Sequence, residues 1–336
     1  MRKKYLGWLL FGLGLLAALV CAMLYSVSTG EVSIALSDIP QILSSKEGME
    51  YFVLTQIRMP RIVLAIAVGG SLGLTGSILQ GIYRNPLVEP YTLGISGGAS
   101  LGVAIVIVLG LHAVSMIMLP LAGFIGALAT IFLVYTLSIR KGSLDINRML
   151  LIGVMISFVA SSAMMFLMSI STAEDLHSIV FWIMGSLDEP NTQLIYLMLG
   201  VSLFGLVIAY SFARPLNALQ LGQSKAEHLG INASTAIRIL FVVSSLMAGI
   251  CVAVAGVIGF VGLIIPHLVR IIIGSDFRIS LIGSFLGGGL FLVVSDVVAR
   301  TIIAPNELPI GVITGIVGGL IFMVVLSNLK RKPKLS

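Results

Sequence analysis

The sequence predicts an all-α membrane protein that crosses the bilayer many times. Hydrophobic residues make up 58% of the 336 positions, and charged residues make up only 10%. The mean hydropathy of +1.11 is too high for a chain that exposes most of its surface to water. Apolar runs of about 20 residues recur along the chain, and this is the length that a helix needs to cross the hydrocarbon core of a membrane.

Ten apolar runs are candidate membrane-spanning helices of one transmembrane domain over residues 1–336. They cover residues 5–27, 62–82, 93–111, 115–139, 149–170, 192–212, 237–258, 259–273, 279–299 and 310–327. The stretch 237–273 is long for one crossing and short for two, and Gly256, Gly259 and Gly262 permit a tight turn inside it. The first run follows a basic start and continues to Val27, so we interpret it as a span and not as a cleaved signal peptide.

The placement of basic residues favours ten spans with both termini on the inner side of the membrane. With that topology, sixteen of the twenty lysines and arginines fall on the inner side. The exceptions on the outer side are Lys46, Arg58, Arg61 and Arg300. Nine spans would place the basic C-terminal tail outside and break this bias. The net charge of +6 therefore reflects topology and gives no reason to expect nucleic acid as a partner.

Glycines at four-residue spacing recur inside the predicted spans. The sets are Gly69/Gly73, Gly94/Gly98/Gly102, Gly283/Gly287 and Gly311/Gly315/Gly319. This spacing lets the backbones of neighbouring membrane helices approach closely. We therefore expect a tightly packed bundle, although the spacing is common in membrane proteins and indicates no particular function.

The longest polar segment between two apolar blocks is Arg214–Asn232, which reads RPLNALQLGQSKAEHLGIN. It is rich in helix-forming residues, and Ala226–Gly230 predicts a short surface helix that ends at a glycine with positive φ. The alternative is an ordinary loop between helices, but 19 residues with a helical pattern are many for that purpose. A soluble partner could bind a helix of this kind.

A second irregular segment lies between the second and third predicted spans. Residues 80–99 read QGIYRNPLVEPYTLGISGGA. The two prolines stop one helix, and the glycine and serine cluster lets the next helix begin with an exposed backbone. Irregular backbone at membrane depth is tolerated only where protein or a water-filled cavity covers it. The alternative is a turn on the inner side followed by a glycine-rich helix.

Several ordered motifs extend from about residue 58 to the end of the chain. They are Arg58-Met59-Pro60-Arg61, the 80–99 stretch, Trp182–Leu187, Gly259–Leu263 with Pro266, His267 and Arg270, Asp276-Phe277-Arg278, Asp296 with Arg300, and Glu307-Leu308-Pro309. Together these motifs resemble the permease family of bacterial iron-siderophore, haem and vitamin B12 ABC importers. Phe277 departs from the family pattern, in which many members have histidine at that position.

The resemblance implies a type II ABC importer permease with ten helices, in which spans two to five and seven to ten are related by inverted pseudosymmetry. It implies a homodimer or heterodimer around a central pathway, two cytoplasmic ATPase subunits and an extracytoplasmic binding protein. The cargo would be an iron-siderophore or a related metal chelate, with haem and cobalamin as alternatives. The protein would lie in the bacterial cytoplasmic membrane and move its cargo into the cytoplasm.

The resemblance also assigns residues to partner contacts. The residues expected to couple the permease to the ATPase are Ala226, Glu227, His228, Leu229 and Gly230. The residues expected to bind acidic side chains of the binding protein are Arg58, Arg61 and Arg300, because arginine presents a planar fork that fits a carboxylate. The alternative for these arginines is local pairing, in which Arg300 contacts Asp296 or Glu307 and Arg61 contacts lipid headgroups.

The fifth predicted span contains residues that could line a transport pathway. They are Ser157, Ser161, Met164, Met165 and Met168. Methionine is unbranched and adaptable, so it suits a path for a bulky ligand that must not bind tightly. Packing against lipid explains the same residues equally well, and the resemblance to the importer permeases favours the pathway.

No motif in the sequence indicates chemistry by this chain. The phosphate-binding pattern G-x-x-x-x-G-K-[ST] is absent, so ATP and Mg²⁺ would bind a separate ATPase subunit and this chain would carry no cofactor. The histidines share no metal-ligand spacing, and we expect no metal site; they are His112, His177, His228 and His267. Cys21 and Cys251 lie in apolar runs, where cysteine is most simply a packing residue.

Two other function classes are alternatives. An intramembrane serine protease could use Ser96, in Gly94-Ile95-Ser96-Gly97, with His267 as its base. An ion-coupled secondary transporter needs a titratable group deep in the bundle. Asp296 is the only acidic residue inside a predicted span, and it lies one helical turn from Arg300, which favours a structural ion pair instead.

Overall fold

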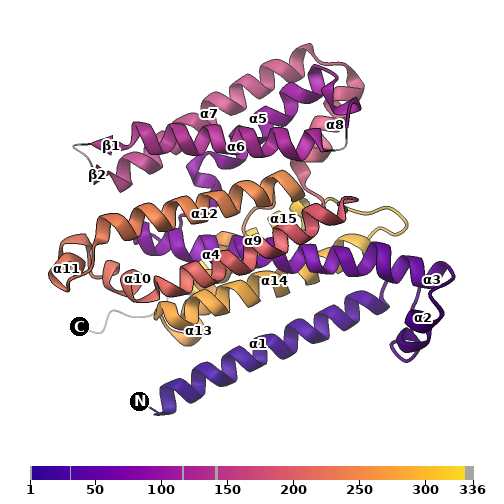
Figure 1. The fold of residues 1–336 in the computed structure, drawn as a ribbon, viewed down its shortest axis with the longest axis horizontal. Coiled ribbons are helices and arrows are strands. Elements are labelled where there is room, and N and C mark those ends of the chain that lie inside the picture. Colours follow the sequence, from indigo (N-terminus) through magenta and orange to yellow (C-terminus); the bar gives the residue numbers. More distant parts are fainter. Residues whose placement is uncertain (1, 31, 116, 141–142, 330–336) are drawn as a thin grey trace.

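The protein is a bundle of long helices, most of which run along one common direction (Figure 1). The computed structural model describes residues 2–30, 32–115, 117–140 and 143–329. The long helices are α1 (Arg2–Ser28), α4 (Met59–Tyr83), α5 (Ile95–Val108), α6 (Met118–Leu137), α7 (Ile146–Ile170), α9 (Thr192–Ser211), α12 (Ala233–Ala255), α13 (Val261–Ile273), α14 (Phe277–Thr301) and α15 (Ile310–Leu329). They form the part of the protein that the sequence predicts to lie in the membrane.

Short elements close the two ends of the bundle. They are α2 (Ile39–Ser45), α3 (Met49–Phe52), the π-helical turn η1 (Val53–Arg58), the 3₁₀ turns η2 (Pro90–Leu93) and η3 (Leu111–Ala113), α8 (Ala173–Met184), α10 (Ala213–Leu219), α11 (Gln223–His228), and the small hairpin of β1 (Ile139–Arg140) and β2 (Ser143–Leu144). The hairpin, α10 and α11 lie at one end, and α2, α3 and α8 lie at the other (Figure 1).

The all-α membrane class is confirmed. Within the described residues, a helix occupies each of the ten ranges that the apolar runs predict. Seven of the helices are long and apolar enough to cross a membrane, while residues 95–108, 261–273 and 310–325 form shorter apolar helices. The exact number of crossings therefore stays a prediction. The run 237–273 is divided after Ala255, where Gly256 has a φ of +69° and a Cβ atom would clash with the carbonyl oxygen of Trp182.

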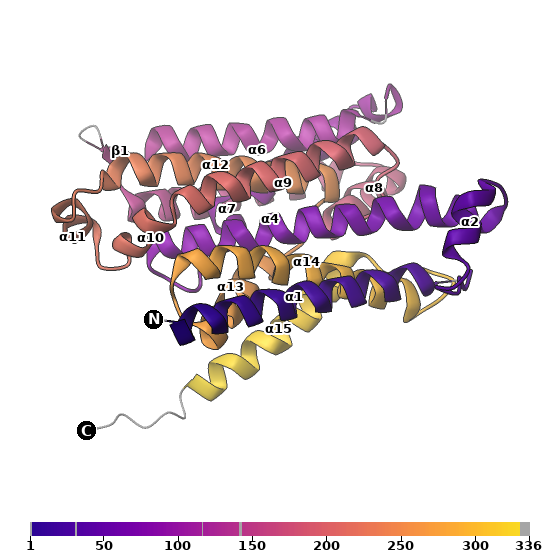
Figure 2. The ribbon, with the colours of Figure 1, turned by 60° about the horizontal axis from the view of Figure 1, so that its bottom comes forward.

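The two halves of the bundle run in opposite directions, as an inverted repeat requires. Helix α4 starts near α3 at one end, whereas its counterpart α12 starts near α11 at the other (Figure 1). Helices α6 and α7 meet at the β1–β2 hairpin, and their counterparts α14 and α15 meet at the opposite end (Figure 2). The directions therefore agree with the predicted pseudosymmetry.

Helix α4 forms the centre of the bundle, and glycines let it contact α14 closely. A Cβ atom on Gly69 would clash with the carbonyl oxygen of Gly288, and one on Gly288 would clash with that of Gly69. The same relation joins α5 to α6 through Gly98 and Gly126. The predicted close approach is confirmed for these helices. By contrast, a Cβ atom on Gly315 of α15 would meet no atom within 4 Å.

Helices α1, α7 and α15 lie at the periphery and expose large apolar side chains. On α7 the exposed ones include Leu151, Phe158, Val159, Met165 and Phe166, and α15 exposes Ile316, Leu320, Met323 and Val324. Surfaces of this composition are stable only against lipid or another protein. Helix α1 lies at one edge of the bundle and packs chiefly on α14 (Figure 1).

Candidate functional site

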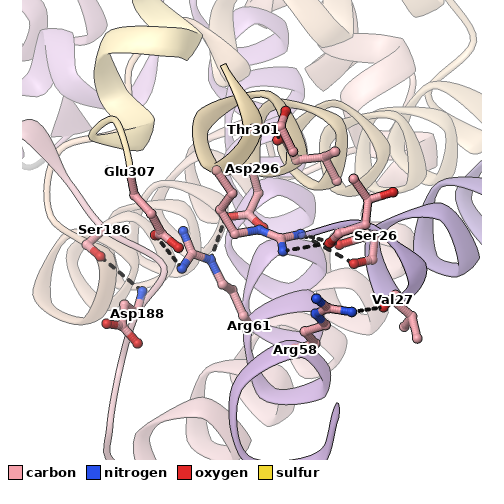
Figure 3. A network of polar contacts seen from close by, with 12 residues as sticks. Ser26, Val27, Arg58, Arg61, Ser186, Asp188, Asp296, Thr301 and Glu307 are labelled. Carbon is pink, nitrogen blue, oxygen red and sulfur yellow. Dashed lines mark hydrogen bonds and ion pairs between the residues drawn. The ribbon is translucent and has the colours of Figure 1, made fainter. Parts of the chain in front are cut away.

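The two groups of residues expected to contact partners lie at opposite ends of the bundle (Figure 1). We call the end with α10 and α11 the α11 end. We call the end where α1 stops, α4 begins and α14 stops the arginine end, because Arg58 and Arg61 lie there (Figure 3) and Arg300 lies in the last turn of α14. A protein that transmits a signal between two partners across a membrane needs this arrangement.

Helix α11 is a short surface helix with a glycine-dependent end, as the sequence predicts. The backbone N–H of Gly230 donates to the carbonyl of Glu227 at 2.9 Å, and that of Ile231 donates to Ala226 at 3.1 Å. This pair of bonds forms a Schellman motif, which needs a left-handed residue after the helix. Gly230 supplies it with a φ of +79°, so the predicted positive φ is confirmed.

The predicted coupling residues divide into one anchor and an exposed group. The side chain of Ala226 is fully buried against the bundle, whereas Glu227, His228, Leu229 and Gly230 are exposed. Leu229, at 63% exposure, is an apolar side chain that water covers poorly. The segment therefore presents a mixed polar and apolar surface on a fixed base.

Hydrogen bonds from α10 and from Gln220, which follows it, attach this part of the chain to the start of α14. The side-chain amide of Asn217 donates to Asp276 Oδ1 at 3.0 Å and accepts from the backbone N–H of Phe277 at 2.9 Å. The amide of Gln220 donates to the carbonyl of Ser275 at 2.8 Å. Phe277 itself is buried in the apolar cluster below α10, so this departure from the family pattern is a packing residue. A displacement of α10 or α11 therefore acts directly on α14.

Asp276 is the N-cap of α14 and accepts a hydrogen bond from the backbone N–H of Arg278 at 3.1 Å. Partial burial acts to raise the pKa of Asp276, but the hydrogen bonds from Asn217 and Arg278 and the charge of Lys4 outweigh it. The pKa of Asp276 therefore lies below its usual value, and the carboxylate stays ionised at neutral pH.

At the arginine end, one buried aspartate joins two arginines (Figure 3). Arg61 Nε lies 2.7 Å from Asp296 Oδ1, and Arg300 Nε lies 3.0 Å from Asp296 Oδ2. Arg61 Nη1 also lies 2.7 Å from Glu307 Oε2. The side chains of Arg61, Asp296 and Arg300 are at most 9% exposed. Local pairing of Arg300 with Asp296 is confirmed, but pairing of Arg61 with lipid headgroups is wrong, because two carboxylates of the chain itself contact it.

Arg58 and Arg300 also donate hydrogen bonds to the end of α1 and to the residues that follow it. Arg58 is 4% exposed and donates to the carbonyls of Val27 and Val32. Arg300 donates to Ser26 Oγ at 2.9 Å and to the Thr29 carbonyl at 3.2 Å. Carbonyls at the end of a helix lack partners within the helix and attract cations. The arginines therefore cap α1 and hold it against α4 and α14.

The spacing in Arg58-Met59-Pro60-Arg61 places both arginines on one side of a continuous helix. Pro60 has no backbone N–H, and its ring would clash with the carbonyl four residues earlier in a regular helix. The π-helical turn Val53–Arg58 precedes it and widens the backbone at this point. Such turns occur often at functional sites.

The charges of the ionic cluster itself, which comprises Arg58, Arg61, Arg300, Asp296 and Glu307, do not balance. Three guanidinium groups face two carboxylates, and among the described residues Arg58 forms no ion pair. Glu307 is the accessible member, because its side chain is 48% exposed. The cluster therefore carries excess positive charge, and its exposed carboxylate occupies one face of Arg61.

The 80–99 segment contacts the motif of residues 259–270 inside the bundle. The Gln80 side chain donates to the carbonyls of Gly262 and Leu263 at 3.1 and 3.2 Å, and it accepts a hydrogen bond from Arg270. Glu89 accepts a hydrogen bond from the backbone N–H of Phe260. Side chains of one half thus satisfy exposed backbone groups of the other, as irregular backbone within a membrane requires.

The residues predicted to line a pathway on α7 do not share one surface. Met164 and Met168 pack against the apolar cluster that includes Val103 and Ile107, while Met165 is 68% exposed. The hydroxyl of Ser157 donates to the carbonyl of Gly153 on its own helix at 3.1 Å, and Ser161 is half-buried. Their role in a pathway stays a prediction.

The residues proposed for a serine protease or a metal site are not brought together in the part of the chain that the structure describes. Ser96 and His267 form no hydrogen bond with each other, and the His267 ring lies 6.5 Å from that of Phe322. Among the described residues, no three histidine, cysteine or acidic side chains gather as a metal site would require. What the structure offers is a buried ionic cluster at one end and an anchored surface helix at the other.

Comparison with known proteins decides the family. The family model described as the FecCD transport family matches residues 18–328. The chain belongs to the FecCD transport family. It is 38% identical to the hemin transport system permease protein HmuU of Yersinia pestis, over 92% of each chain. It is 37% identical to the vitamin B12 import system permease protein BtuC of Salmonella paratyphi A, over 98% of each chain.

Solved structures agree with this FecCD assignment. The fold superimposes on a solved structure described as an inward-facing conformation of a metal-chelate type ABC transporter, with a TM-score of 0.83. The two chains are 31% identical, and the match covers 95% of this chain and 99% of the other. PsaBC of Streptococcus pneumoniae shares the fold at 17% identity, with a TM-score of 0.54 and coverage of 85% and 94%. The chain is thus an ABC importer permease and not an enzyme; the ATPase is a separate subunit.

Sequence reasoning found the members of the ionic cluster and the pair of Asp296 and Arg300, but not the contacts of Arg61 and Arg58. Arg61 and Asp296 are 235 positions apart, and no local pattern links them. The carbonyls of Val27, Thr29 and Val32 were also missed, because a backbone acceptor leaves no trace in the residue type. Asn217 and Gln80 could have been noticed as amides inside otherwise apolar surroundings, since such groups need hydrogen-bond partners.

Proposed function

We propose that this permease carries an iron-siderophore or a related metal chelate into the bacterial cytoplasm. The observation that best supports the cargo is the likeness to the metal-chelate type transporter over nearly the whole of both chains. Haem and cobalamin are the alternative cargoes, because relatives of similar identity are a hemin permease and a vitamin B12 permease. We propose that two copies, or this chain and a related one, assemble with two ATPase subunits that bind ATP and Mg²⁺.

The test is uptake by the complete importer. The permease is reconstituted in vesicles with the ATPase and the binding protein encoded beside it, and ATP-dependent uptake of a ferric siderophore, haemin and cobalamin is compared. We expect uptake of a ferric siderophore. Uptake of haemin or cobalamin alone would contradict the proposed cargo and support the corresponding alternative.

We further propose that the coupling surface is Ala226–Gly230, seated in the ATPase. The support is physical: four of these residues are exposed, the fifth anchors the helix, and α10 connects them to the start of α14 through Asn217 and Asp276. Motion of the ATPase would therefore be transmitted to α14, which packs against the central helix α4.

We propose that the arginine end receives acidic residues of the binding protein, doubled by the symmetry of the dimer. Within the ionic cluster, the guanidinium groups of Arg58, Arg61 and Arg300 outnumber the carboxylates of Asp296 and Glu307. Because their side chains are buried, docking would proceed by exchange: the partner's carboxylate takes the place of Glu307 on Arg61. This step would free the loop between α14 and α15.

These proposals require the α11 end, with both termini, to face the cytoplasm. In a background with Cys21→Ala and Cys251→Ala, single cysteines replace Leu87 or Ser224 at the α11 end and Glu47 at the arginine end; all three positions are exposed. We expect an impermeant thiol reagent applied outside the cell to modify only Glu47→Cys. Labelling of Leu87→Cys or Ser224→Cys from outside would reverse the proposed orientation.

A further inference from the structure

A groove of about 830 Å³ lies between α1 and the rest of the bundle at the α11 end. The first turns of α1 form one wall, the end of α9 and start of α10 form the other, and the first turns of α14 form the floor. None of the residues proposed to contact a partner, Ala226–Gly230 or Arg58, Arg61 and Arg300, lines the groove. Helix α1 is mostly exposed along its length, so it covers this part of α14 only in part.

The inner part of the groove is apolar. Leu9, Leu13, Ile282 and Leu286 line it, and Gly12 leaves a gap in the α1 wall, because a Cβ atom there would meet nothing within 4 Å. From Arg278 to Leu286 the floor extends about 12 Å along the helix axis. A flexible hydrocarbon chain suits a groove of this length and apolar lining.

The mouth of the groove is basic. Arg214 and Arg278 line it, and among the described residues neither guanidinium group forms an ion pair. The nearby carboxylate of Asp276 is already engaged by Lys4 at 3.5 Å and by Asn217. Two positive charges are therefore left to attract an anion.

Aromatic residues mark the same mouth as a membrane interface. Tyr5 and Trp8 line the groove and contact each other edge to face, with ring centroids 5.3 Å apart. Lys4 Nζ lies 4.7 Å from the centre of the Trp8 ring. Tyrosine and tryptophan concentrate at the level of lipid headgroups, where one side of the ring is apolar and the other is wet. The basic mouth thus lies at headgroup depth, and the apolar part lies at acyl-chain depth.

We propose that this groove binds one anionic phospholipid, with the phosphate at Arg214 and Arg278 and an acyl chain along Gly12 and Leu13. Charge complementarity selects an anionic headgroup, since basic pockets between membrane helices bind such lipids. An acyl chain in the groove makes van der Waals contacts with the side chains beside α1 that an empty groove would lack. The bound lipid fills the space between α1 and the bundle and connects them at the end where α10 is anchored.

Fluorescence of Trp8 provides a direct test. The chain has two tryptophans, so Trp182→Phe leaves Trp8 alone in the groove wall. The purified permease is placed in nanodiscs with increasing fractions of brominated phosphatidylglycerol or brominated phosphatidylcholine, because bromine quenches tryptophan on contact. We expect half-maximal quenching at a roughly tenfold lower fraction of phosphatidylglycerol, as two arginines at the headgroup favour an anion.

Three variants locate the lipid. R214Q/R278Q should remove the preference for phosphatidylglycerol, while Gly12→Phe should weaken quenching by both lipids because the ring fills the groove. Gly14→Phe is the matched control: its Cβ atom also meets nothing within 4 Å, but Gly14 does not line the groove, so quenching should be unchanged. Excess inorganic phosphate should not relieve the quenching, since it lacks an acyl chain.

Equal quenching of Trp8 by the two lipids, or an unchanged preference in R214Q/R278Q, would overturn the proposal. Quenching that Gly12→Phe does not weaken would place the lipid elsewhere on the surface and overturn it as well. Native mass spectrometry provides an independent comparison in the chain that keeps Trp182. It measures how much phosphatidylglycerol and phosphatidylcholine stay bound after detergent exchange. Loss of that retention in R214Q/R278Q but not in Gly14→Phe is expected.

Discussion

The two ends of this FecCD permease hold their charges in opposite ways. At the arginine end, Arg61, Asp296 and Arg300 are buried in one ionic cluster that binds α1, α4 and α14 together. At the α11 end, charged side chains such as Glu227 are exposed, and backbone and amide hydrogen bonds hold α11 in place. A buried charge cannot be changed without changing the fold, whereas an exposed one can. Substitutions at the two ends should therefore affect different properties.

The largest effect is expected for Asp296→Ala. Removal of this carboxylate leaves Arg61 and Arg300 buried with only Glu307 nearby, which should cost about 3–5 kcal/mol of unfolding free energy. Chemical unfolding in detergent measures the loss. Glu227→Ala at the α11 end is the control, with an expected change within about 0.5 kcal/mol. Equal stability of the two variants would show that the ionic cluster is not structural.

Gly230→Val should break function at the α11 end without unfolding the bundle. A β-branched residue in the left-handed region costs roughly 1–2 kcal/mol, so the end of α11 should distort. We expect the complex to assemble and to lose transport-coupled ATP hydrolysis and uptake. Gly230→Asn is the matched control, because asparagine tolerates this φ and should retain most activity. Normal uptake by Gly230→Val would remove the coupling assignment.

Glu307→Gln sharpens the role of the arginine end. Charge reversal at Arg58 or Arg300 would affect both docking and folding, because both side chains are buried. The Glu307 side chain is 48% exposed, so its substitution should affect folding less. If a carboxylate of the binding protein replaces Glu307 on Arg61, the neutral glutamine side chain at position 307 should be displaced more easily than the glutamate. Association of the binding protein, measured by surface binding at several salt concentrations, should be a few-fold faster. A slower association would contradict the exchange.

The smallest effect concerns Asp276, a charge at the α11 end that is only partly buried. Its folded pKa lies below the unfolded value, so its stabilisation is full above the unfolded pKa and is lost as pH falls through the folded pKa. Asp276→Asn retains a capping oxygen but loses the attraction to Lys4, at a cost of about 0.5 kcal/mol at pH 7. In thermal unfolding, the difference from the parent should disappear at acid pH. Lys4→Gln should remove only part of this increment, because the hydrogen bonds from Asn217 and Arg278 also favour the ionised carboxylate, so Asp276→Asn should then cost less than it does in the parent.

Local patterns in the sequence were sufficient for the helices and for some contacts within them. Apolar runs predicted where the ten long helices lie, because a segment in lipid must satisfy its backbone hydrogen bonds internally. The glycine after α11 predicted its own left-handed φ. The pair of Asp296 and Arg300 followed from their separation of one helical turn. Each of these depends only on residues close in the chain.

The tertiary structure alone decided which helices meet and which charges are shared. Gly69 contacts Gly288, and Arg61 contacts Asp296, across more than 200 positions of sequence. All the spans are similarly apolar, since lipid and protein interior favour the same residue types, so composition cannot separate the central α4 from the peripheral α1 and α7. The burial of Arg58, Arg61 and Arg300 likewise depends on the end of α1, whose carbonyls accept their hydrogen bonds only once the helices are packed.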